Sequence, residues 1–150
     1  MSNLPISLFI VGKLDKESIK LIKNNNIETK NYVNISNREL NNIYQTCNIL
    51  LMPSYYEGFG MPILEAQISS MAVVTSNKEP MNKVAGKNSV LVKPDKVLSI
   101  RKAILKLIKN KRFFKKLSKL GKKNALKYDG KLVSNKYKEL YLKILKNENS

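Results

Sequence analysis

The 150-residue sequence predicts an α/β fold: a parallel sheet with helices on both faces, followed by C-terminal helices. Three observations support this expectation. Short apolar runs of strand length alternate with helical segments up to about residue 94. A glycine-containing loop joins one apolar run to a helix, as in a β-α-β unit of a Rossmann-like, doubly wound half. From residue 95 onward the apolar residues recur only with helical spacing.

The first three expected elements lie before residue 36. Residues 6–11 (ISLFIV) are an apolar run of strand length that ends at Gly12. Residues 15–23 predict a short amphipathic helix, because two isoleucines three positions apart share one face. Residues 31–35 (NYVNI) alternate like a half-buried strand. The chain is therefore expected to open with a strand, a helix and a strand.

A capping box marks the start of the next helix. Ser36 and Glu39 have the spacing at which each side chain can bond the other residue's backbone N–H. A second apolar run of strand length, residues 48–52, follows this helix and ends at Pro53. The apolar residues expected on one face of the capped helix are Leu40, Ile43, Tyr44 and Cys47.

Two further strands and a helical part complete the chain. Residues 71–75 have the pattern of a buried strand, and residues 89–92 form a shorter one. Residues 95–147 are expected to be helical, with three apolar stripes that pack on the sheet and on each other. The stripes are Val97, Ile100, Ala103, Ile104, Leu107 and Ile108; Phe113, Leu117 and Leu120; and Val133, Tyr137, Leu140, Tyr141 and Ile144.

The most informative segment is residues 57–65 (EGFGMPILE), which follows the strand at residues 48–52. Pro62 suits the first turn of a helix, where its missing N–H has no partner to lose. Gly58 and Gly60 permit a tight backbone path with outward-facing N–H groups. With the positive end of the helix, these groups predict a pocket for an anion or a polyhydroxyl group. Such a loop lies at the carboxyl ends of the strands, where open parallel sheets bind ligands.

The surrounding sequence resembles a known family. Four segments occur in that family's order: PSYYEGFGMPILEA, VVTSN, MNKVAG and VLVKPD. They resemble the donor-binding domain of retaining glycosyltransferases of GT-B architecture, the large group with a Glu-x7-Glu signature. The resemblance extends from Ile6 to Leu145. The spacing of two glutamates alone is weak evidence, but its setting in a glycine loop behind a buried strand is specific.

The resemblance implies roles for five residues. It places Glu57 beside the transferred sugar as the catalytic carboxylate. The backbone of Gly58, Phe59 and Gly60 would contact sugar hydroxyls and phosphate, and Glu65 would accept hydrogen bonds from ribose hydroxyls. These residue types suit the chemistry, because a carboxylate only accepts hydrogen bonds and its negative charge stabilises an oxocarbenium ion. The alternative interpretation is that both glutamates only complement the helix dipole.

The resemblance also implies a domain organisation. Residues 1–150 correspond to a single nucleotide-sugar donor-binding domain, with an α/β part at about 1–94 and a helical part at 95–147. The N-terminal acceptor domain of full-length relatives and the opening strand of the donor domain are expected to be absent. Retaining transfer to a glycan or lipid acceptor would then need an acceptor-domain chain. The alternative function is a non-catalytic module that binds a nucleotide or associates with a membrane.

Positive charge is concentrated in the C-terminal third. The chain has a net charge of +17, and residues 101–150 contain 17 basic and three acidic residues. Three interpretations are open: peripheral contact with an anionic membrane, nucleic-acid binding, or a solvated helix face in a lysine-rich chain. Nucleic acid is the least favoured, because the basic residues are not interleaved with a platform of aromatic side chains.

Composition excludes several kinds of chemistry. The sequence has no histidine, which rules out Ser-His-Asp and Cys-His mechanisms and histidine metal sites. Cys47 is the single cysteine, and we interpret it as an unreactive thiol of the core in a reducing compartment. No apolar run is long enough to span a membrane, and no signal-peptide pattern begins the sequence. We therefore expect a cytoplasmic protein, and by resemblance no metal or other cofactor.

Overall fold

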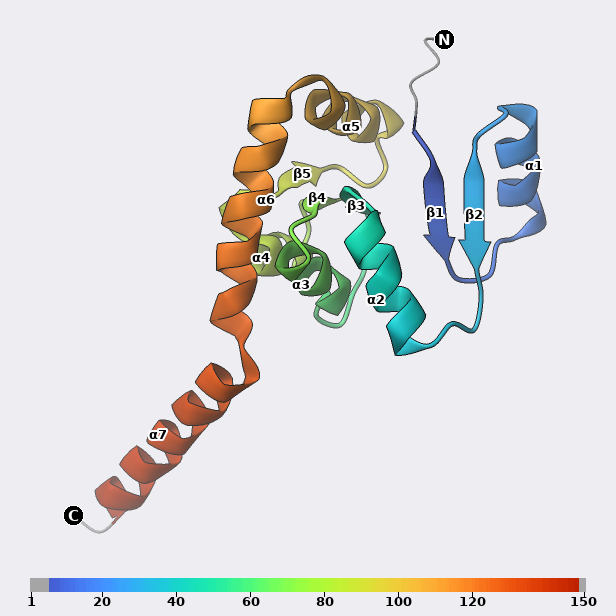
Figure 1. Ribbon diagram of the computed structural model, residues 1–150. Helices are drawn as coiled ribbons and strands as arrows, with labels where there is room; N and C mark the ends of the chain where they lie inside the picture. The colour runs from blue at the N-terminus through green and yellow to red at the C-terminus, as the bar shows by residue number, and fades with distance from the viewer. Residues whose placement is uncertain (1–5, 149–150) are drawn as a thin grey trace. The chain divides into compact units, whose positions relative to one another are not determined.

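A computed structural model describes residues 6–148, with side chains up to residue 146 (Figure 1). The chain divides into two compact units. Unit 1 comprises Met1–Cys47 and unit 2 comprises Asn48–Ser150. The two units are described in turn.

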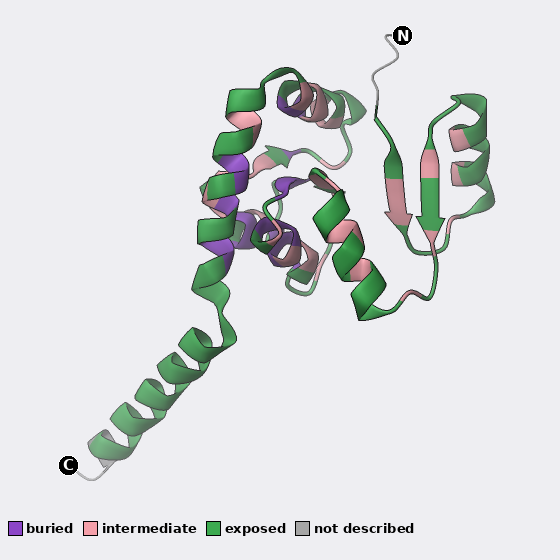
Figure 2. Ribbon diagram, in the orientation of Figure 1, coloured by how far each residue is buried: buried purple, intermediate pink, exposed green. Residues whose placement is uncertain are grey.

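Unit 1 is a strand–helix–strand–helix segment. Strands β1 (Leu8–Val11) and β2 (Thr29–Tyr32) pair in parallel, with Leu8 opposite Thr29 and Val11 opposite Tyr32. Helix α1 (Lys16–Asn24) crosses between them, and helix α2 (Asn37–Thr46) follows. Asp15 caps α1, because its carboxylate accepts the backbone N–H of Ser18 at 2.6 Å. None of the described residues of unit 1 is fully buried (Figure 2).

Three expectations for unit 1 can be compared with the structure. The capping box is confirmed: the Ser36 N–H donates to the Glu39 carboxylate at 2.8 Å, and the Glu39 N–H donates to the Ser36 hydroxyl at 3.3 Å. The strand expected at residues 31–35 is shifted, because β2 ends at Tyr32 and Asn34 has a φ of 56° that no strand can contain. Cys47 is not on the face of α2 but at its C-cap, where partial burial raises the pKa of its thiol.

Unit 2 contains a three-stranded parallel sheet in the order β3-β4-β5. Residues Ile49 and Ala72 are register partners in β3 and β4, as are Val74 and Val90 in β4 and β5. Helices and short 3₁₀ turns (η) connect and follow these strands. The elements are β3 (Ile49–Met52), α3 (Met61–Ile68), β4 (Ala72–Ser76), α4 (Met81–Ala85), η1 (Gly86–Asn88), β5 (Val90–Val92), α5 (Val97–Lys109), α6 (Lys111–Ala125), η2 (Leu126–Tyr128) and α7 (Gly130–Glu148).

The core of unit 2 is built around the central strand β4, whose five residues are all buried (Figure 2). Side chains alternate between the two faces of a strand, so both faces of β4 are covered. On one face, Ala72 and Val74 pack in a cluster with α5 and α6. The cluster also includes Val92, Ala103, Leu107 and Leu117. Burial on both faces explains why the sequence of β4 is an almost continuous apolar run.

The α/β class, with parallel strands flanked by helices, is confirmed. The described strands form two parallel sheets, β1-β2 in unit 1 and β3-β4-β5 in unit 2. The apolar stripes of α5 and α6 contribute to the core as expected, except for Val97, which is 77% exposed.

The expectation for the last stripe is wrong. Helix α7 is exposed at every described position from Gly130 to Lys146, including Val133, Tyr137 and Ile144. The physical reason is that the helix extends beyond η2, so its apolar face has no sheet or helix of unit 2 against it (Figure 1). Among the described residues, none of the helices has both the length and the apolar character needed to cross a membrane.

Candidate functional site

The segment that joins β3 to α3 contains the residues singled out in the sequence. It runs from Pro53 to Gly60 and leaves the carboxyl end of β3. The Thr75 hydroxyl of β4 donates to the Met52 carbonyl at 2.8 Å, which fixes the point where the loop departs. Thr75 is fully buried and Met52 is half-buried, so this bond is partly shielded from water. The loop therefore starts from a rigid position at the edge of the sheet where ligands bind in such folds.

Gly60 shapes the entry into α3. Its φ of 98° and ψ of 40° lie in the left-handed region, and its carbonyl accepts the Ile63 N–H at 3.0 Å. A Cβ atom at Gly60 would lie 3.1 Å from the Ile63 Cδ1 atom. Gly58 differs, because its φ is outside the left-handed region and a Cβ atom there would meet nothing within 4 Å. The conformation of the loop thus requires glycine at residue 60 but not at residue 58.

Pro62 is in the first turn of α3, as predicted, although the helix begins one residue earlier, at Met61. No side chain caps this end of the helix. Pro62 has no N–H and the Ile63 N–H donates to the Gly60 carbonyl, so Met61 carries the candidate donor of the first turn. Ile63 and Leu64 are buried and hold the helix against the core. The N-terminus of α3 therefore offers positive partial charge next to the glycine loop.

The two glutamates lie on either side of this helix start. Glu57 and Glu65 are both half-buried, Glu57 in the loop and Glu65 in the second turn of α3. At a helical rise of 1.5 Å per residue, Glu65 is about 6 Å along the axis from Met61. Within residues 6–148, the Glu57 carboxylate makes no hydrogen bond or ion pair. Glu57, Gly58, Gly60 and the start of α3 thus lie in one continuous segment. Glu65 follows in the second turn of that helix.

Three aromatic side chains of the loop make ring contacts, and two of them contact a lysine that the sequence did not reveal. The Phe59 ring packs edge-on against Tyr128 of η2, with ring centroids 6.0 Å apart. The Lys78 ammonium lies 5.2 Å from the ring centre of Tyr55 and 5.8 Å from that of Tyr56, within cation–π range. The signal for Lys78 in the sequence is its place two residues after β4, whereas its contact with Tyr55 and Tyr56 depends on the fold. Lys78 adds positive charge beside the loop.

A buried polar network fixes α3 at its other end. The Gln67 amide donates to the Ala85 carbonyl at 2.9 Å and to the Ser89 hydroxyl at 3.1 Å. The Asn124 amide of α6 donates to Gln67 at 2.9 Å and to the Val84 carbonyl at 2.8 Å. These groups join α3, α4, the start of β5 and α6. Because they are buried and bonded to one another, the helix that carries Glu65 has a defined orientation.

No metal centre is evident in the described part of the chain, where no group of three or more His, Cys, Asp or Glu residues is arranged to hold an ion.

The sequence pattern of the family described as "Glycosyl transferases group 1" matches residues 2–127. The chain belongs to this glycosyltransferase family. A relative in the same family is the N,N'-diacetylbacillosaminyl-diphospho-undecaprenol alpha-1,3-N-acetylgalactosaminyltransferase of Campylobacter jejuni. It is 28% identical over 107 residues, which cover 70% of this chain and 28% of that protein.

Solved glycosyltransferase structures share the fold. Sucrose-phosphate synthase from Thermosynechococcus elongatus superimposes with a TM-score of 0.80 at 20% identity, over 94% of this chain and 39% of that one. The pneumococcal O-GlcNAc transferase GtfA, solved with UDP and GlcNAc, gives a TM-score of 0.73 at 20% identity, over 93% and 30% of the two chains. This glycosyltransferase chain therefore spans well under half the length of these relatives. The resemblance to GT-B glycosyltransferases is confirmed, whereas the individual roles of Glu57, Gly58, Phe59, Gly60 and Glu65 stay predictions.

Proposed function

We propose that this chain binds a nucleotide-activated sugar for transfer, with retention, to a glycan or lipid acceptor. One observation carries the proposal. The Glu57–Gly60 loop leaves the carboxyl end of β3 and runs directly into α3, which carries Glu65. A ligand at this edge of the sheet would meet backbone N–H groups, two carboxylates and the Lys78 ammonium within one short region.

The two glutamates have different tasks in this proposal. Glu65 accepts hydrogen bonds from the two adjacent ribose hydroxyls of the nucleotide, since the two oxygens of a carboxylate match a vicinal diol. Glu57 lies beside the anomeric carbon and stabilises the positive charge that develops when the leaving group departs. Its carboxylate has no partner among the described residues, which leaves it available to the sugar.

The diphosphate is bound by the N–H groups of Gly58 to Gly60 and by the uncapped start of α3. Lys78 contributes a point charge, held near the loop by Tyr55 and Tyr56. Two relatives support this assignment of substrates. GtfA was solved with UDP and GlcNAc, and the Campylobacter enzyme is named for transfer to a diphospho-undecaprenol-linked sugar.

The test is transfer of radiolabelled sugar from UDP-sugar and GDP-sugar donors. Because the relatives are far longer, transfer is measured for the chain alone and with an added acceptor-binding chain. Glu57→Gln should abolish transfer but keep donor binding, whereas Glu65→Gln should weaken binding about tenfold or more. Glu139→Gln in the exposed helix α7 is the matched control and should leave both unchanged.

Two outcomes would revise the proposal. Donor binding without transfer in every combination would indicate a non-catalytic nucleotide-binding module. Absence of donor binding, or equal effects of Glu65→Gln and Glu139→Gln, would contradict the assignment of this loop.

We also propose, from the family resemblance, that donor binding requires no divalent metal ion. Treatment with EDTA should leave binding and transfer unchanged. A loss of activity that Mg²⁺ or Mn²⁺ restores would show that this part of the proposal is wrong.

A further inference from the structure

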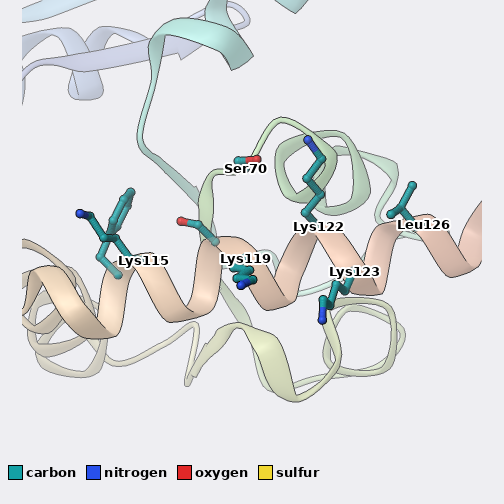
Figure 3. A pocket seen from close by; sticks show the side chains of 8 residues that line it. Ser70, Lys115, Lys119, Lys122, Lys123 and Leu126 are labelled. Atoms are coloured by element: carbon teal, nitrogen blue, oxygen red, sulfur yellow. The ribbon is translucent and has the colours of Figure 1, made fainter.

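A pocket of about 470 Å³ lies beside α6 (Figure 3). Four lysines of α6 line it, together with Ser118 of the same helix and Ser70 from the turn after α3. The lysines are Lys115, Lys119, Lys122 and Lys123. Their spacing places them on one side of the helix, next to the side that packs on α3. The volume falls within the range of pockets that bind small ligands.

The charge in this pocket is uncompensated. No acidic side chain lines it, and none of the four lysines forms an ion pair with a residue that the structure describes. Helix α6 contains seven basic residues and no acidic one. Lysines at i, i+4 spacing, such as Lys115 with Lys119 and Lys119 with Lys123, repel each other. The arrangement therefore costs stability unless an anion neutralises it.

Ser118 provides a second, independent observation. It is only 8% exposed, yet its hydroxyl has no hydrogen-bond partner within the described structure. A buried hydroxyl without a partner is unfavourable, and such groups are uncommon in folded proteins. A ligand in the pocket could accept this hydrogen bond once a neighbouring side chain moves aside. Ser70, which also lines the pocket, has a φ of 63° that a non-glycine residue rarely adopts.

This pocket is separate from the segment of residues 57–65. Ser70 follows the C-terminal end of α3, whereas Gly60 precedes its N-terminal end. The eight residues of α3 extend about 12 Å between these ends. No residue of the 57–65 segment lines the pocket.

We propose that this pocket binds a phosphate or diphosphate group, at a site distinct from the loop of residues 57–60 (the donor loop). Lysine ammonium groups are compact, strongly hydrated charges that suit phosphate oxygens, and serine hydroxyls add neutral donors. The four lysines span about 12 Å along α6, from Lys115 to Lys123, a length that suits a compact phosphate group better than an extended polyanion. The phosphate can belong to a soluble molecule or to a phospholipid headgroup, and the two sources are distinguished by experiment.

The experiment uses the purified full chain and two probes. Sodium pyrophosphate is titrated by calorimetry at low ionic strength, and vesicles of phosphatidylcholine with and without phosphatidic acid are tested by co-sedimentation. The pocket variant is Lys119→Gln with Lys122→Gln. The matched control is Lys111→Gln with Lys116→Gln, which removes the same charge from the same helix at exposed positions outside the pocket.

Compared with the wild-type chain, we expect the pocket variant to bind about tenfold or more weakly to whichever probe the wild type binds. The control variant should differ from the wild type by less than about threefold. Circular dichroism should show the same helix content in both variants, because the four substituted lysines, two in each variant, are exposed. Binding of pyrophosphate alone would identify a soluble ligand, and binding of phosphatidic acid vesicles alone would identify a headgroup.

Three results would overturn the proposal: no binding of either probe by the wild-type chain, equal losses in the two variants, or unchanged binding in the pocket variant. The last result would assign pyrophosphate binding to another site, such as the donor loop. If the wild-type chain binds one of the probes in this pocket but transfers no sugar, the proposed function would be contradicted and the pocket proposal would stand.

Discussion

At the scale of single residues, Gly60 determines the path of the loop more directly than any of its neighbours. Its positive φ and the 3.1 Å approach of Ile63 Cδ1 to a Cβ position both oppose a side chain there. The sequence predicted a tight turn here and the helix start near Pro62, because both follow from local backbone chemistry. Lys78 could not be predicted as easily, since its proximity to Tyr55 depends on how two strands and two loops come together.

Replacement of Gly60 by alanine tests this difference between the two glycines. Gly60→Ala should lower the free energy of unfolding by about 1–2 kcal/mol, because the left-handed backbone and the Ile63 contact both oppose a Cβ atom. Gly58→Ala is the control and should change it by less than about 0.5 kcal/mol. Urea denaturation measures both. Equal effects of the two substitutions would show that Gly60 is not conformationally required.

The capping box gives a prediction about pH. The Ser36 N–H donates to the Glu39 carboxylate and lowers the pKa of that carboxyl below its ordinary value of 4.5. A carboxyl with a lowered folded-state pKa stabilises the fold above its unfolded pKa, and this contribution is lost as the pH falls through the folded pKa.

Wild type should therefore be more stable than Glu39→Gln at neutral pH, and the difference should shrink as the pH falls below 4.5. Denaturation at a series of pH values measures it. A difference that stays constant with pH would mean that the charge of Glu39 does not contribute.

At the scale of secondary structure elements, the helices of unit 2 depend on contacts between distant parts of the chain. The sequence predicted the strands and most helices, because apolar periodicity is a local signal. It did not predict the network of Gln67 and Asn124, which are 57 positions apart and meet only in the folded chain. It also assigned a packed face to α7 from periodicity alone, whereas the structure leaves that face exposed. Periodicity shows which face is apolar but not what covers it.

Substitution of Asn124 tests the role of the network. Asn124→Ala should destabilise the chain by about 1–3 kcal/mol, because the Gln67 carbonyl and the Val84 carbonyl each lose a buried donor. Lys116→Ala, an exposed residue of the same helix, should cost less than about 0.5 kcal/mol. Thermal and urea denaturation give the comparison. A loss for Asn124→Ala no larger than that of the control would show that the network is replaced by water.

At the scale of the whole molecule, the two units differ in how their residues are buried. Unit 2 contains strand β4, which is buried on both faces, whereas no described residue of unit 1 is fully buried (Figure 2). The sequence indicated one α/β domain, since strands and helices alternate throughout residues 1–94. It could not show that burial is so uneven, because burial depends on what packs against each face.

Hydrogen exchange should reveal this difference. Backbone amides of β4 and α3 should exchange far more slowly than those of β1, β2 and α7, because buried hydrogen bonds open only with the surrounding core. Exchange detected by mass spectrometry resolves these segments. Equal protection of β1 and β4 would contradict the uneven core.

Two-dimensional ¹H–¹⁵N NMR tests whether the donor loop binds the nucleotide-sugar. A UDP-sugar or GDP-sugar is added to the ¹⁵N-labelled full chain. We expect the largest shift changes at the amides of Gly58, Phe59 and Gly60 and at the start of α3. Changes confined to α6, or absent throughout residues 57–65, would contradict this expectation.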